Sequence, residues 1–249
     1  TLKSMDTEEF IDIHFYRPIG YRWALFFNKF GISPNTVTIA SIFIGAAAGV
    51  CFYPHNLTIN IIGMLLLIWA NSYDSADGQL ARMTGKKTPL GRILDGTAGD
   101  IWFISIYAAI CARLTPQWGI WIWVFALITG IFHSKQAAMA DYYRNIHLLF
   151  LKGKAGSELS HSPALKENYK KMSWKKDFIY KLFETFYINY TVGQERLTPK
   201  FQRMMQIIRQ DYHDQAPEWF RTAFREKSLP LMKYTNILTF NTRAIALYI

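Results

Sequence analysis

Four long apolar runs in the first part of the chain constrain the fold more than any other feature. They lie at residues 37–53, 57–76, 91–114 and 118–140. A helix needs about 20 apolar residues to cross a bilayer, so runs of this length predict membrane-spanning helices. The second and third runs reach that length only when their polar ends are counted as helix. The sequence therefore predicts an all-α, multi-pass integral membrane protein.

The placement of lysine and arginine predicts how the chain is oriented. Cations collect in connections on the cytoplasmic side of a membrane, and only the connection between the second and third runs is rich in them. Its cations are Arg82, Lys86, Lys87 and Arg92. We therefore expect this connection, the N-terminus and the charged stretch after the fourth run to be cytoplasmic. The net charge of +10 then reflects the segments that lie on the cytoplasmic side of the membrane. The apolar runs exclude a soluble nucleic-acid-binding protein, and no nucleic-acid partner is expected.

These patterns predict four regions, at residues 1–34, 35–142, 143–235 and 236–249. The first mixes aromatic residues with few charges, as an interfacial amphipathic helix does; a helix packed on a soluble partner is the alternative. The second holds the four spans. The third is expected to be a cytoplasmic helical insertion, with short helices at 174–187 and 200–212. The fourth begins another apolar run, so we expect a fifth span and a chain that continues at both ends.

An acidic pattern lies where the second run ends. Asp74 and Asp77 are followed by Gly78, Ala81 and Arg82. A helix advances about 100° per residue, so these five residues share one face, with two carboxylates and a cation beside two very small side chains. Small residues let a bulky ligand approach the backbone. We interpret this face as the floor of a ligand pocket.

A third carboxylate, Asp95, lies at the start of the next run, four residues after Gly91. Because the connection is short, the third span is expected to run antiparallel beside the second, which brings Asp95 near Asp74 and Asp77. Three carboxylates at membrane depth repel one another, and a divalent cation removes the conflict. All-oxygen ligation suits Mg²⁺ or Mn²⁺. A cluster of salt bridges with neighbouring arginines is the alternative.

The spacing of these residues resembles a family motif. The pattern Asp-x2-Asp-Gly-x2-Ala-Arg at 74–82, followed by Gly-x3-Asp at 91–95, is similar to that of the CDP-alcohol phosphotransferase family. The order of the spans extends the resemblance over residues 30–145. It implies a fold of six transmembrane helices, whose last spans would lie at and beyond the end of this chain, and a homodimer.

The motif departs from the family at its last position. The family pattern continues Asp-x3-Asp, which puts a fourth aspartate at position 99, but this sequence has Gly99 there and Asp100 one residue later. On a regular helix Asp100 points about 140° away from Asp95. The two glycines between them favour a π-bulge that restores the alignment. With the bulge Asp100 completes the acidic set; without it, the fourth carboxylate is missing and the general base is in doubt.

The resemblance implies a reaction and a role for each residue. An acceptor hydroxyl attacks the β-phosphorus of a CDP-linked alcohol, commonly CDP-diacylglycerol, and CMP leaves, with two Mg²⁺ or Mn²⁺ ions at the site. The implied metal ligands are Asp74, Asp77, Asp95 and Asp100, of which Asp95 is also catalytic and Asp100 the general base. The implied CDP site is formed by Gly78, Ala81, Arg82 and Gly91. Asn35 and Thr38 resemble the family's nucleotide-side residues, and a helix cap is the alternative.

The acceptor is predicted from basic residues of the fourth span. A lysine inside a membrane span, such as Lys135, is costly unless it faces a water-filled cavity. In similar enzymes that use inositol phosphate, basic residues on later helices hold its phosphate, and Lys135 with Arg144 would do so here. Inositol phosphate or inositol is the expected acceptor; glycerol phosphate, serine, or phosphoethanolamine or phosphocholine transfer to a lipid alcohol are alternatives. A lysine that snorkels to the interface or pairs with Asp141 would have no such role.

A non-catalytic membrane scaffold or an ion-coupled transporter is the competing interpretation from another class. It predicts acidic residues on several spans and gives no reason for Gly78, Ala81 and Arg82 to occur as a set. The motif therefore favours the enzyme, whose partners would be a CDP-linked lipid donor, a small polar acceptor and the bilayer.

Overall fold

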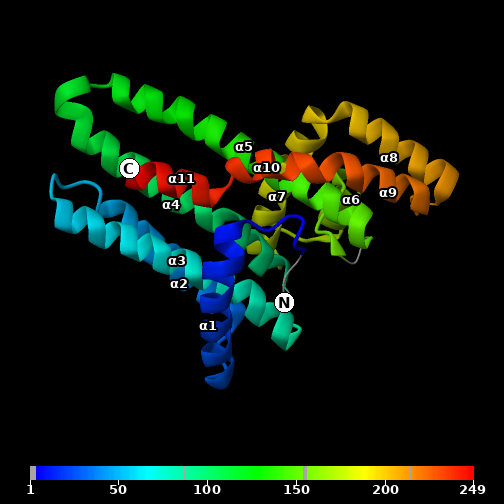
Figure 1. Ribbon diagram of the computed structural model, residues 1–249, viewed down its shortest axis with the longest axis horizontal. Coiled ribbons are helices and arrows are strands. Elements are labelled where there is room, and N and C mark those ends of the chain that lie inside the picture. The colour runs from blue at the N-terminus through cyan, green and yellow to red at the C-terminus, as the bar shows by residue number, and fades with distance from the viewer. Residues whose placement is uncertain (1–3, 87, 154–155, 214) are drawn as a thin grey trace. The chain divides into compact units, whose positions relative to one another are not determined.

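The computed structural model describes residues 4–86, 88–153, 156–213 and 215–249, and within these ranges the chain is helical and contains no strand (Figure 1). Lys87 and the side chain of Arg92, two cations of the expected cytoplasmic connection, lie outside the description. The elements are η1 (Asp12–Tyr16), α1 (Arg17–Lys29), α2 (Pro34–Val50), α3 (Leu57–Thr84), α4 (Pro89–Trp118), α5 (Trp121–Lys152), α6 (Ser162–Lys171), α7 (Phe178–Leu197), α8 (Pro199–Tyr212), α9 (Glu218–Ser228), η3 (Leu229–Leu231), α10 (Met232–Ile237) and α11 (Phe240–Tyr248).

Two compact units make up the chain. The first unit consists mainly of Glu9–Lys135 together with Ile245–Ile249, and the second of Leu2–Glu8 with Gln136–Ala244. The predicted spans lie in α2 to α5. The helix predicted at 200–212 lies in α8, while the one predicted at 174–187 overlaps α7, which begins four residues later, at Phe178, and continues to Leu197. The four regions proposed from the sequence stay predictions.

Local signals in the sequence set the ends of the helices that carry the motif. Ser33 caps α2, because its hydroxyl accepts a hydrogen bond of 3.2 Å from the Thr36 amide. The Thr88 hydroxyl accepts one of 2.9 Å from the Gly91 amide and caps α4. Gly85 ends α3 with a φ of 68°, a left-handed conformation that glycine adopts without steric cost. Gly85 and Thr88 therefore fix a short turn between the two motif-bearing helices.

Glycines allow α2 to lie close against both α3 and α4, as Figure 1 shows for α2 and α3. A Cβ on Gly45 would lie 2.2 Å from Cδ1 of Trp102, and one on Gly63 would lie 2.8 Å from Cβ of Cys51. The indole Nε1 of Trp102 donates to the Ser41 carbonyl at 3.0 Å. Small residues that let backbones approach, with polar side chains bonding across the contact, are typical of helices packed in a membrane.

The N-terminal helix α1 packs on α3. A Cβ on Gly20 would lie 2.8 Å from the Ser75 hydroxyl, and Gln79 Nε2 donates to the Arg17 carbonyl at 3.0 Å. Aromatic contacts extend this interface, since the rings of Trp23 and Tyr73 are 5.0 Å apart at their centres. Helix α1 is therefore an integral part of the first unit.

Two helical segments among the described residues, Leu57–Thr84 and Ile93–Trp118, are long and apolar enough to cross a membrane, while Pro34–Val50 is apolar but shorter. Many large apolar side chains of the first unit are exposed, as a surface in contact with lipid requires. They include Phe43, Leu65, Ile104, Phe125, Leu127 and Phe132. The helical fold and its apolar surface agree with the all-α membrane protein predicted from the sequence. The count of six spans stays a prediction.

The second unit has a core of its own. Tyr142, Ile146 and Phe150 of α5 pack against Met205 and Ile208 of α8. The Asp6 carboxylate accepts a hydrogen bond of 2.9 Å from Arg225 Nε and lies 3.1 Å from Nε2 of the buried His147. These contacts attach the first residues of the chain to the charged region that follows the fourth run.

Glu195 joins three helices of the second unit. Its carboxylate accepts hydrogen bonds from the amide and hydroxyl of Ser162, at 2.9 and 2.5 Å. Arg209 donates to Nε2 of His161, so the imidazole carries its proton on Nδ1 and donates it to Glu195 at 2.7 Å. Burial raises the pKa of Glu195, but the hydrogen bonds from Ser162 and His161 outweigh it and hold the pKa below its ordinary value.

Gly45→Ala is expected to destabilise the first unit by about 1–3 kcal/mol, because the added methyl overlaps the Trp102 ring and forces α2 and α4 apart. Gly130→Ala is the matched control, since among the described residues no atom apart from its chain neighbours and the adjacent backbone of its own helix lies within 4 Å of the added Cβ. Thermal unfolding in detergent, followed by circular dichroism, compares the two. Equal unfolding temperatures would contradict the close approach.

Glu195→Gln is expected to destabilise the second unit by about 1–3 kcal/mol, through loss of charged hydrogen bonds. A carboxyl whose folded pKa is lowered stabilises the fold above its unfolded pKa and loses this effect as pH falls through the folded pKa. The difference between wild type and variant should therefore shrink as pH falls below 4.5, the ordinary value. Glu167→Gln, on an exposed ion pair with Lys171, should change little at any pH. A difference that grows in acid would refute this account.

Candidate metal centre

Three carboxylates of the motif meet where α3 ends and α4 begins. Asp74 and Asp77 come from α3, Asp95 comes from α4, and one ligand oxygen from each lies within 4.8 Å of the others. Asp77 is buried, with 3% of its surface exposed, while Asp74 is half-buried and Asp95 exposed. The expectation that the short connection brings Asp95 to the α3 pair agrees with this geometry.

Thr38 fixes the most buried of these carboxylates. Its hydroxyl on α2 donates to Oδ2 of Asp77, and Thr38 itself is 2% exposed. A side chain that hydrogen-bonds a ligand orients it and tunes its affinity for metal. Thr38, which the sequence places on the nucleotide side, therefore also holds an acidic group of the site.

Asn35 and Gly91 lie against each other. A Cβ on Gly91 would lie 2.5 Å from Oδ1 of Asn35, and that oxygen accepts a hydrogen bond of 3.2 Å from the Thr88 hydroxyl. A side chain at position 91 would therefore displace the amide of Asn35 from this place. Two of the residues predicted for the CDP site thus lie together at the start of α2 and α4.

Gly78, Ala81 and Arg82 lie on α3 beside its two carboxylates, and all three are half-buried. A Cβ on Gly78 would lie 3.4 Å from Nη1 of Arg82, so the guanidinium passes over the glycine. The charge of Arg82 also acts on Asp77. The face predicted from the helical period therefore exists, with a cation alongside its small residues.

Charges of the N-terminal segment, which were not predicted from the sequence, act on the site. Arg17 and Asp12, at either end of the π-helical turn η1, both act electrostatically on Asp74. The hydrogen bond between Gln79 and the Arg17 backbone keeps this turn against α3. No spacing in the sequence relates Arg17 to a residue nearly 60 positions later; the only local signal is Gly20, whose missing side chain permits the contact.

Asp100 is not part of the acidic group. α4 is an unbroken α-helix from Pro89 to Trp118, so the expected π-bulge between Asp95 and Asp100 is wrong. A regular helix turns Asp100 about 140° from Asp95, and the group of possible metal ligands found among the described residues holds Asp74, Asp77 and Asp95. The two glycines of this stretch loosen the helix too little to change its hydrogen-bonding period.

Lys135 and Arg144 lie nine residues apart on α5, in different compact units. Arg144 donates to Oδ1 of Asn236 from Nε at 3.2 Å and from Nη2 at 2.7 Å. The joint role of the two cations in binding an acceptor phosphate stays a prediction.

Comparison with known proteins assigns a family to the part of the chain that contains the three carboxylates. Residues 31–146 match the sequence model of the family described as CDP-alcohol phosphatidyltransferase. These residues form a CDP-alcohol phosphatidyltransferase domain. The family is one of membrane transferases that use a divalent metal. Asp74, Asp77 and Asp95 all lie inside the matched region.

Two curated relatives each match a part of the chain. An uncharacterized protein of Aquifex aeolicus (strain VF5) is 39% identical over 119 residues, which cover 47% of this chain and 59% of the relative. The archaetidylinositol phosphate synthase of Pyrococcus horikoshii is 33% identical over 90 residues, covering 36% of this chain and 46% of the relative. The chain thus spans about half the length of the curated relatives it matches. No solved structure matches it.

The chemistry of the acidic group fits the metal that the CDP-alcohol phosphatidyltransferase family uses. All three side chains offer oxygen, which is the ligand atom preferred by Mg²⁺ and Mn²⁺. Their separations, within 4.8 Å, allow one cation to reach all three carboxylates. Three negative groups this close repel one another, and a divalent cation balances them.

Thr38→Val is expected to weaken Mn²⁺ binding by about 10- to 100-fold, the usual cost of losing a partner that orients a metal ligand. The substitution keeps the shape of the side chain and removes the donor to Asp77. Mn²⁺ titration followed by electron paramagnetic resonance measures the change. Thr36→Val, at an exposed position of the same helix, is the control, and an equal effect of both substitutions would argue against a role for the Thr38 hydroxyl.

Proposed function

We propose that the protein is a CDP-alcohol phosphotransferase that transfers the phosphoalcohol group of a CDP-linked lipid to a small polar acceptor and releases CMP. The observation that carries this proposal is the meeting of Asp74, Asp77 and Asp95 at the ends of two helices, inside a CDP-alcohol phosphatidyltransferase domain. CDP-diacylglycerol is the donor we propose, which makes phospholipid biosynthesis the process it serves.

Asp74, Asp77 and Asp95 would hold the metal, with Thr38 orienting Asp77. Two bound ions, Mg²⁺ or Mn²⁺, would neutralise the pyrophosphate and stabilise charge on the attacking and leaving oxygens. Without a cation, the same three carboxylates would repel the donor. The domain therefore needs its acidic group and its metal together.

The donor would lie along the face of α3 that carries Gly78 and Ala81. Arg82 passes over Gly78, where its guanidinium can pair with phosphate oxygens. Asn35 and Gly91, which lie together at the starts of α2 and α4, would complete the site on the nucleotide side. Half-buried small residues leave the backbone accessible to a ligand as large as CDP.

The reaction breaks one bond and forms one. The acceptor oxygen attacks the β-phosphorus, the bond from this phosphorus to the oxygen shared with the α-phosphate breaks, and CMP leaves with that oxygen. The acceptor hydroxyl loses its proton to a base. The motif suggests Asp100 for this base, but Asp100 lies on another face of α4 from Asp95.

Inositol phosphate or inositol is the acceptor we propose. The archaetidylinositol phosphate synthase that resembles part of this chain supports an inositol-containing acceptor. Lys135 and Arg144 on α5 would contribute positive charge to an acceptor phosphate. The enzyme would be a multi-pass membrane protein and a homodimer, with its active site facing the cytoplasm.

Asp95→Asn is expected to reduce CMP release by at least about 100-fold, because one of three metal-binding carboxylates loses its charge. Purified protein in nanodiscs, supplied with CDP-diacylglycerol, Mg²⁺ or Mn²⁺ and a panel of polar acceptors, provides the measurement. Asp211→Asn, at an exposed aspartate of α8, is the matched control and should retain full activity. Chelation with EDTA should stop CMP release, and added Mn²⁺ should restore it.

Two outcomes would overturn the proposal. One is folded wild-type protein that yields no CMP from any pair of CDP-alcohol and acceptor. The other is activity that survives both metal removal and Asp95→Asn. Ion transport driven by the acidic group, with no CMP release, would favour the transporter interpretation.

A further inference from the structure

Helix α7 of the second unit turns polar side chains inward. Lys181, Thr191 and Gln194 are buried. Gln194 Nε2 donates to the Ala138 carbonyl of α5 at 2.8 Å, and Lys181 Nζ donates to the Met172 carbonyl, also at 2.8 Å. Buried polar groups need such partners, so these hydrogen bonds fix which side of α7 faces the interior of the second unit.

The opposite side of α7 is an exposed apolar stripe. Because a helix turns about 100° per residue, the large apolar side chains of this stripe point within about 60° of one another. They are 38–62% exposed and consist of Ile179, Leu182, Phe186 and Leu197. Gly193 lies on the same side, and among the described residues no atom apart from its chain neighbours and the adjacent backbone of its own helix lies within 4 Å of a Cβ built there. An apolar stripe along a helix of 20 residues indicates an apolar partner.

An exposed tryptophan lies at the start of this stripe. Lys181 Nζ is 4.5 Å from the ring centre of Tyr169 and 5.3 Å from that of Trp174, so the cation holds both rings beside α7. The rings of Trp174 and Phe178 are 5.9 Å apart at their centres, and both are exposed. A tryptophan at the border between an apolar surface and a charged segment is typical of side chains at a membrane–water interface.

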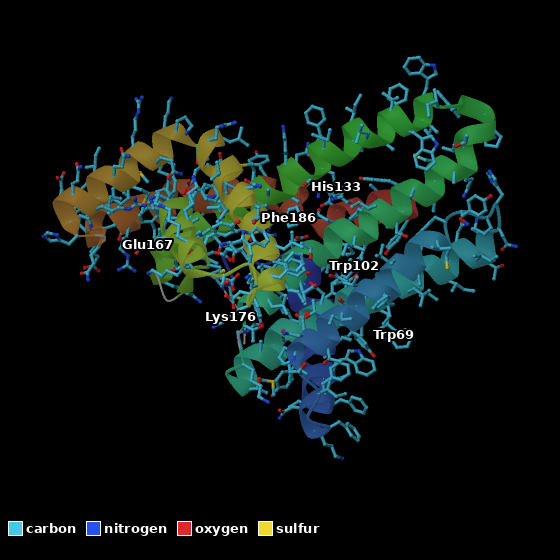
Figure 2. The ribbon with its side chains drawn as sticks, turned by 180° about the vertical axis from the view of Figure 1, so that it is seen from behind. Trp69, Trp102, His133, Glu167, Lys176 and Phe186 are labelled. Carbon is cyan, nitrogen blue, oxygen red and sulfur yellow. The ribbon has the colours of Figure 1, made fainter. Side chains whose placement is uncertain are left out.

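Exposed lysines collect just before α7. They outnumber the acids of the same stretch, Glu167 and Asp177, and consist of Lys166, Lys170, Lys171, Lys175 and Lys176. Figure 2 labels Lys176 in this cluster and Phe186 on the stripe. Lysines clustered beside an amphipathic helix attract the anionic lipids of the cytoplasmic leaflet. The charge of the cluster therefore complements an anionic bilayer.

We propose that the apolar stripe of α7 and the lysine cluster before it form a docking surface for an anionic bilayer, with α7 lying in the membrane interface. The lysines favour the bilayer over a second copy of the chain. Two copies joined through this side in the same orientation would bring like charges together, whereas anionic head groups neutralise them. The inference goes beyond the proposed function, because it assigns a role to the second unit that involves no catalysis.

Collisions of a spin label with oxygen and with a water-soluble nickel chelate test the proposal on the full chain in nanodiscs. The label is attached through Phe186→Cys, or through Gln206→Cys at an exposed position of α8 as the control, with Cys51→Ser and Cys111→Ser in both. In discs of phosphatidylcholine and phosphatidylglycerol in equal amounts, nickel collisions at position 186 should be at least about 5-fold rarer than at 206, because the chelate stays out of the apolar layer. Oxygen, which dissolves in lipid, should still reach the label. Unchanged thermal unfolding confirms that the variants fold.

The lysine cluster is tested with the label at position 186. Lys175→Gln combined with Lys176→Gln should raise the nickel collision rate at least about 2-fold in the anionic discs, because two charges that attract the lipid are lost. Lys200→Gln combined with Lys227→Gln, at exposed positions of α8 and α9, is the matched control and should leave the rate unchanged. Discs of phosphatidylcholine alone should raise the rate as the loss of the two lysines does.

Three results would overturn the inference. Equal nickel collision rates at positions 186 and 206 would show that the stripe lies in water. Rare collisions with both reagents at 186 would show that protein covers it, and dipolar broadening between labels on two chains would identify a second copy as the cover. A rate that responds neither to phosphatidylglycerol nor to the lysines would contradict docking on an anionic bilayer. None of these measurements depends on CMP release, so they stand apart from the test of the proposed function.

Discussion

Mutual repulsion among three carboxylates is the constraint on which the first unit depends. Asp74, Asp77 and Asp95 have oxygens within 4.8 Å of one another, an arrangement that costs free energy unless a cation is bound. The fold supplies what holds them there: a short turn between α3 and α4, and α2 packed closely against both. Like charges held this close are an arrangement that a bound cation stabilises.

Close packing of the helices fixes the positions of these carboxylates. Gly45 admits the Trp102 ring and Gly63 admits the β-carbon of Cys51, so α2 lies near enough to both neighbours for Thr38 to reach Asp77. Where α1 packs on α3, Gly20 admits Ser75, and the charge of Arg17 acts on Asp74. The surroundings of the carboxylates thus include two helices, α1 and α2, that the motif itself does not contain.

The sequence predicted the part of the site that follows from helical period. The spacing of Asp74, Asp77 and Gly78 places them on one face whatever surrounds the helix, and a short connection forces Asp95 back toward them. The contribution of Arg17 could not be predicted, because it depends on how a separate helix packs. The position of Asp100 was predicted wrongly: glycines at 96 and 99 favoured a π-bulge, but the backbone of α4 keeps its regular hydrogen bonds and turns Asp100 away.

Anomalous scattering from crystals grown with Mn²⁺ tests the central claim most directly, because it locates the cation without an assay of activity. The account predicts an anomalous peak within about 2.0–2.4 Å of oxygens from Asp74, Asp77 and Asp95, and none against Asp100. Absence of a peak between these three carboxylates, in crystals that scatter well, would contradict it. A peak shared between Asp95 and Asp100 would contradict the assignment of the two faces of α4.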